Sequence, residues 1–194
     1  MEVGPIASGL SFNGYDKEGN PMFDKVKSCN IYNLETSYKV KDFLANWNIS
    51  AHHWLKYYVY LRQLSNKKRE GFNLSATFLT FLMSAIWHGF YPGYYVFFMG
   101  AGLMDYHFKI SEKALAPYFT SMPFSVVFAV AYLWCYMGAA YFGIGFTLLG
   151  VEKFHKVYLS INYYYHILLI GSIIVFTALL PKAKSRKEGS IKTD

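Results

Sequence analysis

Residues 124–149 read FSVVFAVAYLWCYMGAAYFGIGFTLL, and none of these side chains is charged. The uncharged stretch around them is longer still, since no Lys, Arg, Asp or Glu occurs between Lys113 and Glu152. About 20 mostly apolar helical residues are enough to cross a bilayer core about 30 Å thick. The stretch therefore predicts a membrane-spanning helix over residues 124–149.

A second uncharged stretch precedes Asp105 and is divided by a proline. Residues 74–90 predict an apolar helix, which Pro92-Gly93 interrupts because proline lacks a backbone donor and glycine adds backbone freedom. A shorter apolar segment follows at residues 94–104, and we expect a loop over residues 105–123. We expect this segment to be a re-entrant or tilted piece, so its number of crossings stays open.

A third uncharged stretch follows Lys156, and residues 158–180 within it predict another span. In the span over residues 124–149, Ala139 and Gly143 lie four residues apart. Small residues at this spacing let two membrane helices approach closely. We therefore expect this face to pack against another helix.

The composition is typical of a membrane protein. Of the 194 residues, 54% are hydrophobic and only 16% are charged, against roughly 25% charged in a soluble globular domain. The net charge of +7 is compatible with nucleic-acid binding, but the cations flank the apolar stretches, as membrane topology requires. We therefore expect no nucleic-acid partner.

Together these stretches predict an all-α fold, a polytopic membrane protein with about four membrane helices in a single domain over residues 1–194. Residues 1–46 are polar and rich in turn sequences, so we expect loops and short interfacial helices there. Helices and spans fill residues 47–180, and residues 181–194 form a basic tail. The positive-inside rule puts this tail and the basic segment 62–70 in the cytoplasm, which requires an even number of crossings, four or two.

His88 is the first candidate for catalysis, because an ionisable side chain in an apolar segment is costly and is a functional hypothesis by default. A neutral imidazole can take a proton from a hydroxyl, as a general base does. Ser84 and Ala85 lie one helical turn earlier and are small, so another helix or a lipid chain can approach the ring. The alternative is a histidine that is hydrogen-bonded in a helix bundle or sits at the interface beside Trp87.

A second group of candidates lies in residues 47–62, which we expect to be helical, at the membrane interface or along a wet cavity. The amide of Asn48 can orient a hydroxyl or stabilise an oxyanion, and His52 lies one helical turn further on. Two histidines without a carboxylate at ligand spacing are weak evidence for a metal, so no metal is expected. For His166, which follows three tyrosines, anchoring at the interface is the preferred interpretation.

Three segments form a distinctive series: residues 9–14 (GLSFNG), 47–62 (WNISAHHWLKYYVYLR) and 84–94 (SAIWHGFYPGY). In this series the chain resembles the membrane-bound O-acyltransferase family, and within it the lysophospholipid acyltransferases of the plant and fungal type. Their pattern is a tryptophan-asparagine pair followed about forty residues later by tryptophan-histidine-glycine. Here Asn48 and His88 are forty residues apart.

The resemblance implies transfer of a fatty acyl group from acyl-CoA, as co-substrate, to the free hydroxyl of a lysophospholipid, with no cofactor. It implies a tunnel through the membrane, with His88 as the general base and Asn48 positioning the substrate or stabilising the oxyanion. Four further residues are expected to contact the substrates: Trp47, Trp87, His52 and Arg62. The cations that begin at Arg62 suit the phosphates of coenzyme A, although a topology signal is the preferred interpretation of them.

Two alternatives stay open. The acceptor in the same family could instead be a sterol, diacylglycerol or protein hydroxyl, or the chain could be a truncated, non-catalytic membrane protein that packs with other subunits. Members of the family are longer, and this chain resembles their C-terminal part. Its expected partners are therefore membrane lipids and either a second copy or a missing N-terminal half, and the resemblance implies the endoplasmic reticulum.

Overall fold

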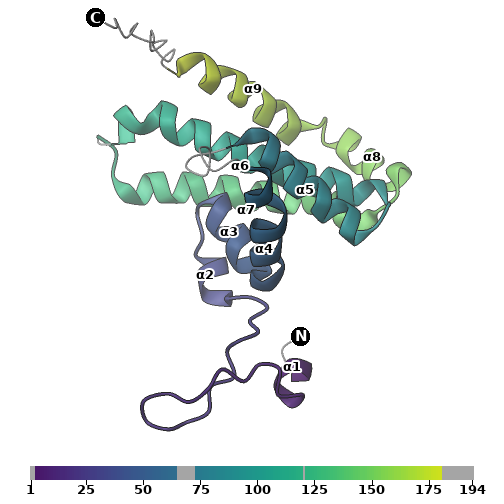
Figure 1. Cartoon of the computed structure of the whole chain (residues 1–194). Coiled ribbons are helices and arrows are strands. Elements are labelled where there is room, and N and C mark those ends of the chain that lie inside the picture. Colours follow the sequence, from purple (N-terminus) through teal and green to yellow (C-terminus); the bar gives the residue numbers. More distant parts are fainter. Residues whose placement is uncertain (1–2, 65–72, 120, 181–194) are drawn as a thin grey trace, which may run out of the picture.

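The computed structural model describes residues 3–64, 73–119 and 121–180, and this part of the chain is helical apart from loops and one antiparallel bridge, Tyr15 to Pro21. The prediction of an all-α fold is confirmed. Figure 1 shows the elements, which are in chain order α1 (Val3–Ala7), α2 (Ile31–Glu35), α3 (Val40–Trp47), α4 (Ile49–Leu55), the π-helical turn η1 (Lys56–Tyr60), the 3₁₀ turn η2 (Leu61–Gln63), α5 (Leu74–His88), α6 (Pro92–Phe119), α7 (Phe124–Leu148), α8 (Val151–Ser160) and α9 (Tyr164–Leu179).

The long helices α6 and α7 lie side by side in the centre of the molecule, and α5 and α9 pack on α6 (Figure 1). The core between them is rich in aromatic rings and includes one buried cysteine. Its buried members are Val40, Met104, Cys135, Tyr141, Phe142, Phe154, Tyr158, Tyr165 and Leu169. Helices from both halves of the chain therefore share one core.

The start of α6 is held against the end of α7 by a backbone contact. The Gly93 N–H donates to the carbonyl of Leu149 at 2.9 Å. A Cβ at Gly93 would overlap the carbonyl oxygen of Gly145, and a backbone atom cannot move aside as a flexible side chain can. Only glycine fits at residue 93.

Within this chain, α7 packs closely through Gly138 rather than through Gly143. A Cβ at Gly138 would overlap Met104 and Tyr165, whereas a Cβ at Gly143 would meet nothing within 4 Å. The expectation that Gly143 lies against another helix is therefore wrong for the described part of the chain. The inward face of α7 is fixed instead by Cys135, Gly138 and Phe142, which are all buried.

The span expected over residues 124–149 is found as α7. Among the described residues, α7 is the one helix that is long and apolar enough, by length and composition, to cross a membrane. The pair α8 and α9, which meet at 75°, would count together as a second. The count of about four membrane helices stays a prediction, because α5 is apolar but only 15 residues long.

The short segment expected at residues 94–104 is instead the beginning of α6, which runs without a break for 28 residues. The charged residues that suggested a loop after Met104 lie on this helix. Lys109 pairs with Asp105 one turn earlier, Nζ to Oδ2 at 2.5 Å, so both charges are accommodated in helical geometry.

The span expected at residues 158–180 begins only at Tyr164 as a straight helix. Asn162 and Tyr163 have φ of 52° and 50°, in the left-handed region that non-glycine residues rarely adopt. These two residues end α8 and turn the chain by 75° into α9.

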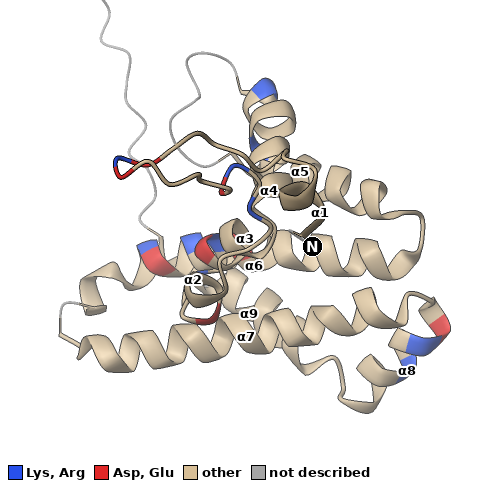
Figure 2. Ribbon diagram, turned by 90° about the horizontal axis from the view of Figure 1, so that it is seen from below, with Lys and Arg blue, Asp and Glu red and all other residues tan. Residues whose placement is uncertain are grey.

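Residues 3–46 form a loop and short helices, as expected, while the position of these helices at a membrane surface stays a prediction. In the loop the Asn13 N–H donates to the Met22 carbonyl at 2.8 Å. The amphipathic helix α3 then lies on α6, and Lys39 Nζ pairs with Glu112 Oε1 at 2.7 Å. Figure 2 shows that charge gathers in the loop, along α3 and the adjoining part of α6, and on α8, whereas α7 and α9 carry none.

Residues 47–62 are mostly helical, as expected, although Asn48 separates α3 from α4. The chain continues from α4 through η1 and η2 without leaving helical geometry. Residues 65–70 of the basic segment and the basic tail 181–194 lie outside the described residues.

Candidate active site

His88 is the last residue of α5. The helix ends there because Gly89 has φ of 128°, a conformation that favours glycine. The Gly89 N–H still donates to the carbonyls of Ala85 and Ile86, at 3.2 and 3.1 Å. Ser84 and Ala85 are buried, and α5 packs on α6, as the small size of these two residues predicted.

Three aromatic rings surround one side of the His88 imidazole. The distances from its ring centroid are 4.8 Å to Phe98, 5.5 Å to Phe146 and 5.6 Å to Tyr94. The other side of the His88 side chain is exposed. No hydrogen bond joins its ring to another described residue, so the ring nitrogens are available to a substrate hydroxyl.

Asn48 lies at the junction of α3 and α4 and caps the second of these helices. Its Oδ1 accepts a hydrogen bond from the Ala51 N–H at 3.2 Å. This is an ordinary N-cap contact. The Asn48 side chain is exposed, and no hydrogen bond from its amino group to another described residue is formed.

The two candidate residues come from different helices, and two tryptophans connect those helices. Trp54 of α4 packs edge-to-face on Trp87 of α5, with ring centroids 5.1 Å apart. Asn48 caps the helix that carries Trp54, and His88 directly follows Trp87. The structure therefore brings the two motif segments together but forms no hydrogen bond between Asn48 and His88.

The two tryptophans of the motifs are both largely exposed, at 59% each. Trp47 stacks on Phe43 at 5.9 Å between ring centroids, and Trp87 contacts Trp54. Each has an aromatic partner on one side and open surface on the other. That arrangement leaves ring area for an apolar ligand.

The other two substrate-binding candidates lie on α4 and η2. His52 is half-buried, and burial, together with the positive charges of neighbouring Lys56 and Lys41, lowers the pKa of its imidazole. Arg62 is exposed and its guanidinium lies 5.2 Å from the centre of the Tyr58 ring. Arg62 thus has no carboxylate partner among the described residues and is able to bind an anion.

His166 makes a structural contact. Its Nδ1 is 2.6 Å from the hydroxyl oxygen of Tyr141, a hydrogen bond that joins α9 to α7. Anchoring of His166 at a membrane interface stays a prediction. The described residues contain no group of three or more His, Cys, Asp or Glu that could hold a metal ion.

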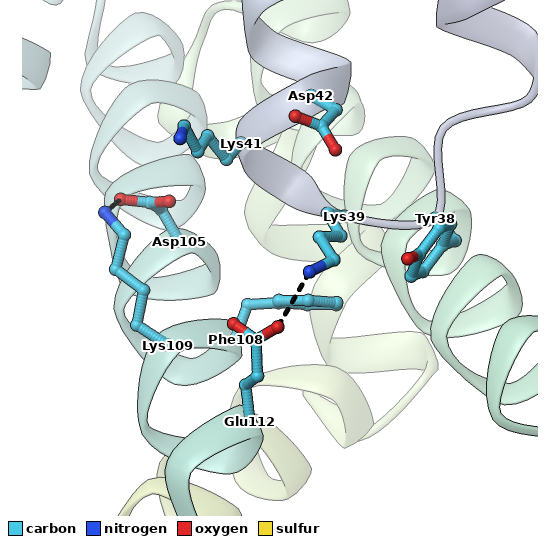
Figure 3. Close-up of a pocket in the computed structure, with 8 residues that line it drawn as sticks. All are labelled: Tyr38, Lys39, Lys41, Asp42, Asp105, Phe108, Lys109 and Glu112. Carbon is cyan, nitrogen blue, oxygen red and sulfur yellow. Dashed lines mark hydrogen bonds and ion pairs between the residues drawn. The ribbon is translucent and has the colours of Figure 1, made fainter. Parts of the chain in front are cut away.

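Two features of the structure were not predicted from the sequence. His107 of α6 is buried and stacks on Trp134, with ring centroids 5.0 Å apart, and neither ring nitrogen has a partner among the described residues. A charged groove also lies between α3 and α6 (Figure 3). Half of its charged residues lie between Asp105 and Glu112, where the sequence suggested a loop.

Comparison with known proteins supports the resemblance. The model of the membrane-bound O-acyltransferase family matches residues 2–151. The lysophospholipid acyltransferase of Schizosaccharomyces pombe is 31% identical over 180 residues, which cover 89% of this chain and 35% of that protein. The lysophospholipid acyltransferase of Saccharomyces cerevisiae is 32% identical over 191 residues, which cover 94% of this chain and 30% of that protein.

The similarity extends to animals. The human membrane-bound glycerophospholipid O-acyltransferase 1 is 33% identical over 191 residues, which cover 93% of this chain and 35% of that protein. The chain thus spans about a third of the length of these curated relatives. Since the family match includes both motif segments and most of the chain, this chain belongs to the membrane-bound O-acyltransferase family.

Proposed function

We propose that this chain carries the catalytic residues of an acyltransferase that moves a fatty acyl group from acyl-CoA to the free hydroxyl of a lysophospholipid. The observation that carries the proposal is the pair Asn48 and His88, forty residues apart in a chain whose relatives include proteins named lysophospholipid acyltransferases. The protein is an integral membrane protein, and we propose that it resides in the endoplasmic reticulum.

In this proposal His88 is the general base. A ring nitrogen takes the proton of the lysophospholipid hydroxyl while the hydroxyl oxygen attacks the thioester carbonyl carbon of acyl-CoA. The C–S bond of the tetrahedral intermediate then breaks, the ester is formed, and the proton passes from the imidazole to the departing sulfur of CoA. The rings of Phe98, Phe146 and Tyr94 support this role because they keep water from the side of the imidazole that they cover.

Asn48 acts on the negative charge that develops on the thioester oxygen during the reaction. The carbonyl oxygen of its side chain is occupied by the N-cap hydrogen bond to Ala51, so its amino group is the end left to donate. An N–H aimed at the thioester oxygen stabilises the oxyanion of the intermediate. The amino group is equally suited to position the acceptor.

The remaining candidates contact the substrates. Trp47 and Trp87 offer exposed ring surface to the acyl chains, and His52 lies one helical turn after Asn48. Arg62, with the cations that follow it in the sequence, suits the phosphates of CoA on the cytoplasmic side.

The test is acylation of lysophosphatidylcholine by the 194-residue chain in membranes that lack this activity, with His88→Ala as the variant. Loss of a general base is expected to reduce turnover by a factor of about 10² to 10⁴. His53→Ala is the matched control, because His53 is an exposed histidine on α4 with no assigned role. Membrane insertion of each variant is measured by its recovery after alkaline extraction.

Equal turnover of the chain and of His88→Ala would contradict the role of His88. No turnover in any variant would mean either that the chain needs a missing N-terminal half for activity or that it is a non-catalytic membrane protein. Turnover with a sterol, diacylglycerol or protein acceptor in place of the lysophospholipid would correct the substrate class and keep the mechanism.

A further inference from the structure

A groove with a volume of about 520 Å³ lies between α3 and α6, away from the His88 ring. We call it the α3–α6 groove. Six charged side chains line it: Lys39, Lys41, Asp42, Asp105, Lys109 and Glu112. Figure 3 shows that three of them come from α3 or the residue before it and three from α6. The volume falls within the range of roughly 300–1,000 Å³ that is typical of small-molecule sites.

Four of the six charges are already paired across or along the groove. Lys39 Nζ lies 2.7 Å from Glu112 Oε1, and Lys109 Nζ lies 2.5 Å from Asp105 Oδ2 (Figure 3). The Asp105 residue is only 6% exposed, so its carboxylate is a buried charge held in place. The hydrogen bond that Lys39 donates to Glu112 raises the pKa of Lys39, which stays protonated.

The two remaining charges are adjacent in the sequence and opposite in sign. Lys41 and Asp42 are exposed, and neither forms an ion pair with another described residue. The groove therefore offers one cation and one anion to a ligand while its net charge is zero. A polyanion such as the phosphates of a nucleotide finds no excess positive charge here, whereas a ligand that carries both signs finds a partner for each.

The groove lies where charged and apolar surfaces meet. Phe108 and Tyr38 form apolar parts of its lining, and Val40 of α3 is buried in the core beneath it. The charges of α3 and α6 are flanked by the uncharged helices α7 and α9 (Figure 2). A ligand with a charged end and an apolar remainder suits such a boundary.

We propose that the α3–α6 groove binds the zwitterionic head group of a phospholipid, with the phosphate at Lys41 and the ammonium group at Asp42. His88 is not among the residues that line the groove. The bound lipid is a diacyl phospholipid of the surrounding bilayer, and a lysophospholipid, which carries the same head group, is the alternative that the experiment distinguishes.

The experiment measures lipid binding to the whole chain in an uncharged detergent by native mass spectrometry. The probes are phosphatidylethanolamine, phosphatidic acid, which lacks the ammonium group, and diacylglycerol, which lacks both charges. The variants are Lys41→Ala and Asp42→Asn, with Lys156→Ala on α8 as the matched control. Because Lys41 and Asp42 are exposed, helix content and thermal unfolding should not change.

An ion pair with an exposed side chain is worth roughly 0.2–1 kcal/mol, which is at most about fivefold in affinity. Lys41→Ala should therefore weaken the binding of both phosphatidylethanolamine and phosphatidic acid by up to about fivefold, and Asp42→Asn should weaken the binding of phosphatidylethanolamine alone. Diacylglycerol should bind weakly to every form, and Lys156→Ala should match the unaltered chain.

Undiminished phosphatidylethanolamine binding in both variants would overturn the proposal, and so would the absence of lipid binding in the unaltered chain. Lysophosphatidylethanolamine distinguishes the two lipids. Weaker binding than that of phosphatidylethanolamine is expected for a bilayer-lipid site, whereas tighter binding would contradict it and would indicate a site for the lysophospholipid acceptor. Because binding is measured without turnover, failure here is separate from failure of the acyl-transfer proposal.

Discussion

The side-chain amide of Asn48 has two ends, and they can be tested separately. Its oxygen caps α4 through the Ala51 N–H at 3.2 Å, whereas its amino group is the end assigned to the reaction. Serine caps helices about as well as asparagine but lacks the amino group. A substitution at this residue can therefore remove the catalytic donor and keep the fold.

We expect Asn48→Ser to leave thermal stability nearly unchanged and to lower the rate of acyl transfer about 10²-fold or more, because an oxyanion donor is lost. Asn48→Ala should lower the rate similarly and also destabilise the chain by about 1 kcal/mol, because the cap is lost. Turnover and thermal unfolding of both variants provide the check. Full activity of Asn48→Ser would show that Asn48 is only a helix cap.

The sequence was informative for residues whose role depends on local spacing. The small residues before His88 were identified from neighbours within one helical turn, whereas the cap at Asn48, which divides the helix expected over residues 47–62, was not predicted. The edge-to-face contact of Trp54 with Trp87 and the hydrogen bond of Tyr141 with His166 join residues distant in the sequence. Such pairs depend on how the helices pack, which no local pattern specifies.

At the scale of the elements, the contact between the start of α6 and the end of α7 requires a residue without a side chain at position 93. A Cβ at Gly93 would overlap the Gly145 carbonyl oxygen and lie 2.8 Å from the Leu149 Cα. Both are backbone atoms, so the two helix ends would have to separate.

We expect Gly93→Ala to destabilise the chain by about 1–3 kcal/mol through overpacking. Gly143→Ala is the matched control, since it makes the same change on α7 where a Cβ meets nothing within 4 Å. Thermal unfolding of both variants in the same detergent is the measurement. A similar loss of stability in both would mean that the helix ends do not depend on this contact.

The helix boundaries were predictable where a proline or the end of an uncharged stretch determines them. Pro92 begins α6 and the uncharged run defines α7, as expected. The length of α6 was underestimated because the charges from Asp105 onward suggested a loop, although they pair along the helix. The break before α9 contains no glycine or proline, so no signal in the sequence indicated the positive φ of Asn162 and Tyr163.

At the scale of the whole molecule, the bend between α8 and α9 bears on membrane topology. The tail beyond α9 is basic, whereas α8 connects α7 to the other end of α9. If α9 crosses the bilayer, α8 and the tail lie on opposite sides. The number of crossings could not be read from the sequence, because helices of 15 and 16 residues are near the lower limit for a span.

We expect a cysteine introduced at Lys187 in the tail to react with a membrane-impermeant maleimide in sealed microsomes. A cysteine introduced at Glu152 in α8 should react only after permeabilisation, because a crossing by α9 would put α8 on the luminal side. Cys29 and Cys135 are replaced by serine and alanine first, and a mutant without any cysteine is the control. Labelling of both positions in sealed microsomes would exclude a crossing by α9.

The backbone bond between Gly93 and Leu149 has a consequence for how substrates reach His88. It closes the gap between α6 and α7 beside the loop that follows His88, since the N–H and carbonyl are only 2.9 Å apart. If His88 is the catalytic base, we expect no acyl chain or acceptor to enter between these helix ends. Leu79, Met83 and Ile86 recur on the exposed face of α5 at helical spacing, so we expect an apolar substrate to reach His88 laterally along this face of α5, from the hydrocarbon of the membrane.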